Sequence, residues 1–353
     1  MHLFKIKCKH ILFLTFFINI LNAQDVSVTP TSLSADLNSG EIDSQYIYIA
    51  NNTSTLLNWY LSFDNSDDRF FTNPHHDYSY LQIEKGEEDP RIGAPVDRGA
   101  GGPDESGYKW QDSDEPDGPT FSWEDISSTG INIDGYMLDD NVSGPYPIGF
   151  EFSYYGNTYT EFYVSSNGFI GFDPNMSQGC CSGQPIPTDD AVNNMIAWAW
   201  RDGYPDGNTY YQNFDNKTII MFEGYGLFGG GGGATVEIII YANGQIKINY
   251  LTLTGNYTDG NQSIGIENAD GSDGLQVAFN TDYLHDNLAI QFSQGPTWLT
   301  PEQSSGILSA NTNDSIKVYF NPGSLCEGNY TADIELNFDF TDSDGSFNNV
   351  LQD

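Results

Sequence analysis

The chain has 353 residues, and its 49 Asp and Glu against 12 Lys and Arg give a formal net charge of −37. Phosphate contacts need a basic face, so this charge argues against nucleic acid and against anionic membranes as partners. It permits divalent cations, or it serves solubility in a salty exterior. The length is enough for two domains.

The first residues read as a secretory signal, Met1–Ala23. Its basic start is formed by Lys5, Lys7 and Lys9. An apolar run, Ile11–Leu21, follows and is too short to span a bilayer. An uncleaved anchor is the alternative. We therefore expect a secreted or cell-surface protein with no membrane insertion after cleavage.

Three cysteines remain once Cys8 leaves with the signal: Cys180, Cys181 and Cys326. They cannot all pair within one chain. A bridge between the adjacent Cys180 and Cys181, or from one of them to Cys326, stays open because connectivity cannot be read from sequence. No His stands at ligand spacing nearby, so a metal site at these cysteines is not expected.

The apolar pattern predicts an all-β protein, because short alternating runs are separated by Gly, Asn, Asp and Pro. Three hairpins are predicted: Thr235–Tyr250, Tyr210–Glu223 and Glu161–Phe172. In the first, Asn243-Gly244 fits a type I′ turn, in which both central residues take positive φ.

Two distant stretches look like halves of one domain, Asp25–Asp64 and Pro296–Phe340. Each supplies strands and a Trp, and neither buries a core alone. They resemble the immunoglobulin-like repeats of bacterial surface proteins, through Trp298-Leu299-Thr300-Pro301 and Gly328-Asn329-Tyr330-Thr331. The alternative is two separate incomplete repeats.

The stretch between them resembles the nidogen-like module of large secreted bacterial proteins, some of them subtilisin-like proteases. The segments that carry the resemblance keep their order along the chain: Gly107-Tyr108-Lys109-Trp110, Trp123-Glu124-Asp125-Ile126, Val164-Ser165-Ser166-Asn167-Gly168-Phe169-Ile170, Ile196-Ala197-Trp198-Ala199-Trp200-Arg201-Asp202 and Ile264-Gly265-Ile266-Glu267-Asn268. The resemblance implies a β-sandwich used in adhesion or matrix contact, with no catalytic role.

The predicted fold is thus an immunoglobulin-like β-sandwich interrupted by a larger nidogen-like β-sandwich. The expected boundaries follow the chain: signal 1–23, first immunoglobulin-like half 24–72, exposed linker 73–106, nidogen-like domain 107–292, second half 293–340, and a truncated linker or the start of a next segment at 341–353.

Catalytic signatures are weak. No Gly-x-Ser-x-Gly elbow and no His-Glu-x-x-His helix occurs. With this many acids, a glycosidase pair of carboxylates can always be chosen, so it carries no signal. Of the three His after the signal, His75-His76 stands in the linker and His285 resembles a structural position of the family. We expect a protein that is not an enzyme.

Calcium is the best chemical hypothesis, because Ca²⁺ takes six to eight oxygens from Asp, Asn and loop carbonyls. The candidate ligands are Asp112, Asp114 and Asp117, with Asp139 and Asp140 expected close by. A second oxygen-rich turn holds Asp202, Asp206 and Asn208. Solvated turns are the alternative, because Asp and Asn favour turns in any case.

Tyrosines could instead stack on sugar rings if several share one face: Tyr154, Tyr155, Tyr204, Tyr210, Tyr211 and Tyr225. Core packing is the stronger expectation for them and for the six Trp, which bury large apolar areas. The sequence predicts an adhesion, matrix-contact or spacer module that binds a polysaccharide or a matrix or surface protein. The alternatives are an accessory region of a secreted hydrolase and a polysaccharide-binding module.

Overall fold

A computed structural model of the chain describes residues 9–18, 26–38, 41–64, 80–87, 89–96, 99–115, 118–295, 298–321 and 328–341. The chain divides into two units, each described here by itself. Unit 1 consists of residues 1–68, 242–244 and 294–353, and unit 2 of residues 69–241 and 245–293. The described residues form strands and two short 3-10 helices, so the predicted all-β class is confirmed.

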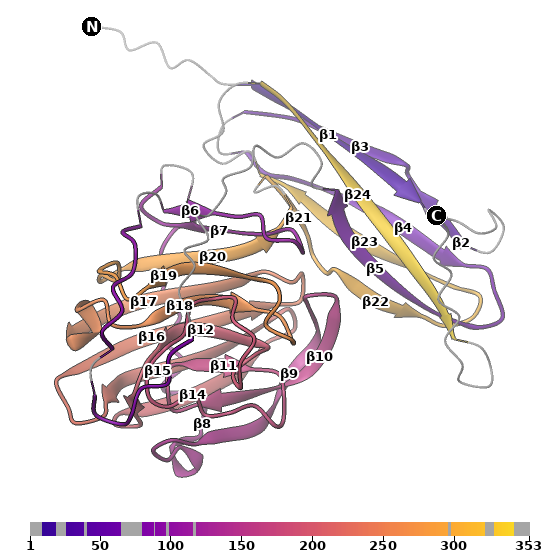
Figure 1. The fold of residues 1–353 in the computed structure, drawn as a ribbon. Helices are drawn as coiled ribbons and strands as arrows, with labels where there is room; N and C mark the ends of the chain where they lie inside the picture. The colour runs from indigo at the N-terminus through magenta and orange to yellow at the C-terminus, as the bar shows by residue number, and fades with distance from the viewer. Residues whose placement is uncertain are drawn as a thin grey trace, which may run out of the picture. The chain divides into compact units, whose positions relative to one another are not determined.

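Unit 1 contains two sheets (Figure 1). The first has five strands in the order β22 (Ser305–Leu308), β5 (Leu56–Asp64), β24 (Gly328–Thr341), β1 (Lys9–Ile18) and β3 (Ser32–Asn38). The second has four strands in the order β2 (Val26–Thr29), β4 (Asp43–Asn51), β23 (Thr312–Phe320) and β21 (Leu299–Pro301).

Strands from the two ends of the chain pair with one another in both sheets of unit 1. β4 runs antiparallel to β23 from Thr312↔Asn51 to Phe320↔Asp43, and β5 runs antiparallel to β24. One core joins the sheets, because Trp59 and Ile334 of the first pack in a cluster with Ile47 and Ile316 of the second. Unit 1 is therefore a β-sandwich to which both flanks contribute.

The predicted signal overlaps β1. Residues 1–8 and 19–25 lie outside the described residues, but Lys9–Ile18 forms a strand between β24 and β3. Its pairing with β24 is parallel and its pairing with β3 is antiparallel. An apolar run is compatible with a strand and with a secretory signal. The secretory signal Met1–Ala23 therefore stays a prediction.

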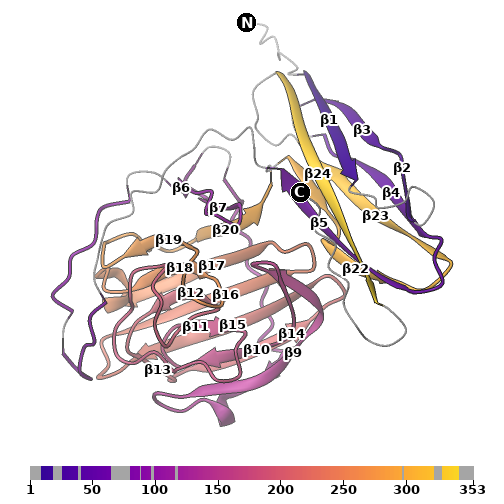
Figure 2. The ribbon, with the colours of Figure 1, turned by 45° about the vertical axis from the view of Figure 1, so that its right-hand side comes forward.

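Unit 2 is built on a nine-stranded and a six-stranded sheet (Figure 2). The larger runs β6 (Ala100–Gly101), β7 (Tyr108–Asp112), β20 (Leu288–Gln294), β17 (Ile246–Gly255), β16 (Gly232–Tyr241), β15 (Lys217–Leu227), β14 (Asn208–Asn213) and β8 (Ile131–Asn132), with β13 (Gly203–Tyr204) also on β15. The smaller runs β19 (Gly274–Phe279), β18 (Ser263–Glu267), β12 (Met195–Trp200), β11 (Phe169–Gly171), β10 (Asn157–Ser165) and β9 (Val142–Tyr154). The 3-10 helices are η1 (Asp134–Tyr136) and η2 (Asn256–Thr258).

The two sheets of unit 2 enclose a large aromatic and aliphatic core. Trp198 of the smaller sheet packs against Phe222 and Tyr225 of the larger one, at centroid distances of 5.0 and 5.9 Å. Smaller apolar clusters lie around Trp200 and around Ile239. Unit 2 is therefore a second β-sandwich.

The three predicted hairpins form as β16–β17, β14–β15 and β10–β11. The type I′ turn predicted at Asn243-Gly244 does not form: Gly244 takes a φ of 82°, but Asn243 is not among the residues with positive φ. Ile240 pairs with Ile246, and Tyr241 N donates to the Gln245 carbonyl, so a longer connection replaces the two-residue turn.

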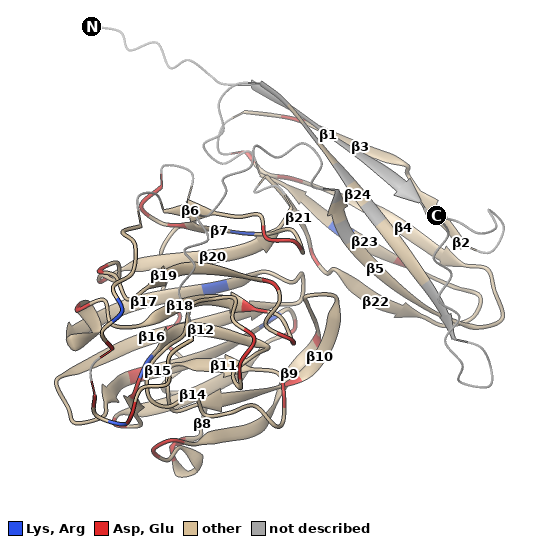
Figure 3. Ribbon diagram, viewed as in Figure 1, with Lys and Arg blue, Asp and Glu red and all other residues tan. Residues whose placement is uncertain are grey.

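The described part of the chain holds no helix long and apolar enough to cross a membrane. Acidic residues are spread over loops and strands of both units, and Lys and Arg are few among them (Figure 3).

Candidate functional site

Three carboxylates from two separate loops of unit 2 lie close together. Asp139 and Asp140 stand between η1 and β9, and Asp202 follows β12. Asp140 takes a φ of 48°, a left-handed conformation that Asp tolerates better than most residues. This loop geometry turns Asp140 toward the loop of Asp202, and the two share Lys85 as a cationic neighbour.

Lys85 occupies the centre of this acidic cluster. Its Nζ lies 2.8 Å from Asp139 Oδ2, 2.5 Å from Asp140 Oδ2 and 3.9 Å from Asp202 Oδ1. The same Nζ lies 4.1 Å from the ring centroid of Phe228, within the range of a cation–π contact. Burial would lower the pKa of Lys85, but its hydrogen bonds to Asp139 and Asp140 and the charge of Asp202 outweigh that effect and raise it.

Asp202 is the most buried of the three carboxylates, with 16% of its side chain exposed. Burial raises its pKa to about 6; Lys85 acts to lower it, and the charges of Asp140 and Asp139 add to the rise. Its Oδ1 is buried and accepts no hydrogen bond from the described residues, and the same holds for Oδ1 of Asn141. Asp202 therefore keeps a buried oxygen that has the Lys85 ammonium at 3.9 Å as its cationic neighbour and accepts no hydrogen bond from the described residues.

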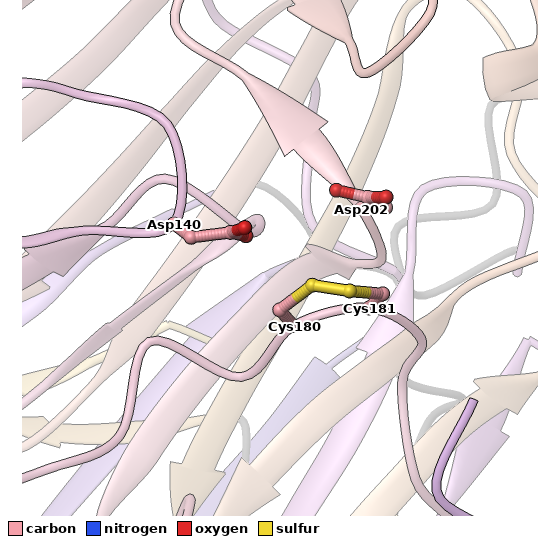
Figure 4. Close-up of side chains that lie close together, drawn as sticks. All are labelled: Asp140, Cys180, Cys181 and Asp202. Atoms are coloured by element: carbon pink, nitrogen blue, oxygen red, sulfur yellow. A yellow bond between two sulfur atoms is a disulfide. The ribbon is translucent and has the colours of Figure 1, made fainter. Parts of the chain in front are cut away.

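A disulfide between sequence neighbours completes the cluster. Cys180 and Cys181 are bonded to each other, while Cys326 lies outside the described residues. Ligand atoms of Asp140, Asp202 and the two cysteines all lie within 4.8 Å of one another. Figure 4 shows the two carboxylates beside the disulfide, each coming from a different segment. Because the sulfurs are bonded together, oxygen is the ligand that this group offers a hard cation.

Two buried side chains hold the disulfide loop in place. Asn167 donates from Nδ2 to the Gln178 carbonyl at 3.1 Å, and Trp200 donates from Nε1 to the Gly179 carbonyl at 2.8 Å. Asn167 also donates to Asp140 Oδ1. Asn167, which lies in the predicted hairpin Glu161–Phe172, therefore connects the disulfide loop to the acidic loop.

Lys85 comes from a segment that the sequence predicted to be an exposed linker. The described residues 80–87 and 89–96, called the strap, are hydrogen-bonded to the rest of unit 2. Leu81 exchanges two hydrogen bonds with the Gln184 side chain. Arg91 donates to Gln184 Oε1 at 2.7 Å and to the Gly183 carbonyl at 2.9 Å. Gly and Pro predicted an irregular backbone here, but they carry no information on these tertiary contacts.

The remaining predicted calcium ligands have other partners. Asp112 is buried and accepts hydrogen bonds from the Tyr283 hydroxyl at 2.7 Å and from Asp114 N at 3.0 Å. Asp114 Oδ2 lies 3.0 Å from His285 Nε2. Asp117 lies outside the described residues. The Asp112 loop therefore directs its oxygens at protein donors, and its described carboxylates are not grouped with Asp139 and Asp140.

Of the second oxygen-rich turn, Asp202 alone joins the described cluster. Asn208 instead donates to Glu223 Oε2 at 3.1 Å. The tyrosines considered for sugar stacking are divided: Tyr154, Tyr211 and Tyr225 are buried in the core, and Tyr204 is exposed. They do not form one exposed row, because the two faces of a strand point in opposite directions.

Sequence reasoning missed Lys85 and the structural role of Asn167. Lys85 is one of 12 Lys and Arg in an acidic chain, and nothing in the sequence identifies its partners.

Residues 118–293 match the family model described as NIDO related. The chain thus contains a nidogen-related module, which is an extracellular type of domain, and the match covers most of the predicted 107–292 segment. No curated protein and no solved structure matches the chain.

Proposed function

We propose that this chain is a non-catalytic extracellular module of a secreted or cell-surface protein, used for adhesion or matrix contact. The observation that carries the proposal is the nidogen-related match over residues 118–293. The strongly acidic composition suits an exterior where salt screens charge. His285, a residue that could serve as a general base, is bound to Asp114 and to the Asp286 carbonyl, which supports a structural role.

Unit 1 is proposed to be the immunoglobulin-like domain that the nidogen-like domain interrupts. The pairing of β4 with β23 and of β5 with β24 supports this, because each pair joins one flank to the other. Insertion into a domain is tolerated at a surface loop. The borders predicted from the sequence are kept for the two immunoglobulin-like halves and the nidogen-like domain, while the strap belongs to unit 2.

The acidic cluster of Asp139, Asp140 and Asp202 is proposed to bind Ca²⁺ in exchange for the Lys85 ammonium. Ca²⁺ prefers carboxylate and carbonyl oxygens, and Oδ1 of Asp202, which accepts no hydrogen bond from the described residues, suits it. Lys85 already neutralises part of the charge there, so it competes with a metal ion. Calcium binding should therefore be weak in the natural chain and stronger without this ammonium.

Titration calorimetry with CaCl₂ tests this exchange. Lys85→Met should tighten Ca²⁺ binding by about tenfold, because it removes a like charge from the site. Asp140→Asn should weaken it, and Lys317→Met, which changes a lysine of unit 1, should leave it unchanged. Absence of Ca²⁺ binding to both the natural chain and Lys85→Met would remove the calcium proposal and leave the adhesion proposal standing.

The adhesion proposal is tested by binding of the chain from Gln24 onward to immobilised matrix proteins and polysaccharides, with CaCl₂ and with EDTA. Saturable binding to a matrix or surface protein supports it. Binding to a polysaccharide alone would replace it with the sugar-binding alternative. Absence of binding to every surface would contradict it and favour a spacer, or an accessory region of a secreted hydrolase.

A further inference from the structure

Strand β1 fills an interior position of the five-stranded sheet in unit 1 (Figure 1). It pairs with β24 from His10↔Gly328 to Ile18↔Leu336, and with β3 from Lys9↔Asn38 to Thr15↔Ser32. Because β1 lies between β24 and β3, the backbone groups on the facing edges of these two strands pair with β1. This sheet therefore depends on the segment 9–18 for its continuity.

That segment lies inside the predicted secretory signal. If the signal is removed, β24 and β3 remain about 9–10 Å apart, twice the usual strand spacing, and each presents a row of unpaired backbone groups. Leu33, Ala35 and Leu37 of β3 and Ile334 and Leu336 of β24 belong to the core of unit 1. Removal of β1 would uncover the seam between these two sets of side chains.

We propose that the position between β24 and β3 is a strand acceptor, and that after signal removal it binds an extended segment of another polypeptide chain. The bound segment is apolar at alternate positions and runs parallel to β24. Addition of an extended segment to unpaired strands of a sheet, insertion between two strands included, is an established mode of peptide recognition. The main chain supplies affinity and alternate side chains supply specificity.

The register of β1 defines which positions of the ligand matter. The positions paired with Leu33, Ala35, Ile334 and Leu336 are 14, 12, 16 and 18 of β1. In this chain they hold Leu12, Leu14, Phe16 and Ile18. Residues directly opposite one another share a face of the sheet, so a ligand needs apolar residues at these four alternate positions.

The direction of β1 favours another chain over the segment that follows β24. A parallel neighbour cannot be reached through a short hairpin, whereas a chain returning from Thr341 would run antiparallel to β24. The twelve residues after Thr341 include Asp342, Asp344 and Asp353. Their apolar residues, Phe347, Val350 and Leu351, do not recur at every second position.

The test uses the chain from Gln24 onward and a labelled peptide of residues 9–18 with lysines added at its ends for solubility. Saturable binding is expected, with slower amide hydrogen exchange in β3 and β24 and a rise of about 5 °C or more in the Tm of unit 1. A matched peptide with Lys at positions 12, 14 and 16 should bind at least about tenfold more weakly. If unit 1 is only partly folded without the peptide, slower amide exchange in β3 and β24 on peptide addition still reports binding at this position.

Three outcomes would overturn the proposal. In the first, β3 and β24 are as protected without peptide as β4 is, and no peptide binds. In the second, only a variant ending at Thr341 binds the peptide, which would assign the position to the chain's own following residues. In the third, the secreted protein retains residues 9–18 on N-terminal sequencing, which would make β1 a resident strand.

Discussion

The side-chain amide nitrogen of Asn167 donates a hydrogen bond of 3.2 Å to Oδ1 of Asp140. Asn167 is fully buried, and its amide oxygen accepts a hydrogen bond of 2.9 Å from Gly203 N. One side chain thus joins the loop of Asp140 to Gly203, which follows Asp202 and begins β13. This link positions two carboxylates that lie far apart in the sequence.

Asn167→Asp should disrupt this link while keeping the size of the side chain. The new carboxylate would face Asp140 and the Gln178 carbonyl, both acceptors, so we expect a loss of about 2–3 kcal/mol in the free energy of unfolding. Urea unfolding followed by tryptophan fluorescence measures it. The exposed Asn157→Asp is the matched control and should change stability by less than about 0.5 kcal/mol. Equal losses in both variants would contradict the role assigned to Asn167.

Calcium affinity should depend on the ionisation of Asp202. Its pKa is raised to about 6, so its carboxyl loses the proton as the pH rises through that value, and only the ionised form attracts Ca²⁺. Affinity should therefore fall by about tenfold between pH 7 and pH 5. Calorimetry of the natural chain and of Lys85→Met is the measurement. Lys85 acts to lower the Asp202 pKa, so the loss of affinity should begin at a higher pH in Lys85→Met, and adding Asp202→Asn should remove most of the dependence. An affinity that does not change over this range would contradict the assignment of Asp202 as a ligand.

The Cys180–Cys181 bond should contribute little to stability. It joins neighbouring residues, so the chain-entropy account, which scales with loop length, gives it only about 1 kcal/mol. The double variant Cys180→Ser, Cys181→Ser should unfold in urea within that margin of the natural chain. Its Ca²⁺ affinity tests whether the disulfide instead shapes the site beside Asp140. A loss several times larger than this margin would show that the bond stabilises the whole of unit 2.

Glu237 should make stability fall as the pH rises. It is fully buried on β16, and burial raises its pKa to about 7, while hydrogen bonds from Asn249 and from Glu124 N act to lower it. A carboxyl whose pKa is higher in the folded state adds stability that is fully present below its unfolded value of about 4.5 and is lost as the pH rises through about 7.

Glu237→Gln removes this titration. The measured quantity is the free energy of unfolding of Glu237→Gln minus that of the natural chain. We expect this difference to rise by about 3 kcal/mol from near pH 4 to near pH 8. Urea unfolding at several pH values measures it, and the comparison cancels the other titrating groups. A constant difference over this range would contradict the raised pKa.

Much of the strand pattern could be predicted because its signals are local. The predicted hairpin Thr235–Tyr250 contains most of β16 and the first half of β17, and Gly244, which takes a positive φ, lies in its connection. The turn type at Asn243 failed because turn geometry also depends on the register that the sheet imposes. Strand existence is therefore better encoded locally than the conformation of the connection.

The composition of the acidic site could not be predicted in the same way. Asp139 and Asp140 were expected close to Asp112, yet the fold brings Asp140 to Asp202. Lys85 reaches them from a strap whose Gly and Pro content predicted a linker. Such contacts depend on how distant segments fold over the sheets, and no local spacing records them.

The joining of the two flanks rests on a contact that one substitution can test. Gly306 of β22 pairs directly with Trp59 of β5, and a Cβ added at Gly306 would lie 2.6 Å from Cζ2 of the indole. Trp59 is completely buried, so its ring has no space to move away. Gly306→Ala should lower the stability of unit 1 by about 1–3 kcal/mol through overpacking.

A double-mutant cycle separates this clash from a general effect of alanine. In a Trp59→Leu background the indole is absent, so Gly306→Ala should cost at least about 1 kcal/mol less than in the natural chain. Gly135→Ala is the control, because a Cβ there meets no atom within 4 Å. If Gly306→Ala had the same cost in both backgrounds, Trp59 would not pack on β22 in solution. That result would contradict the packing of β22 on β5, one of the contacts that join the two flanks.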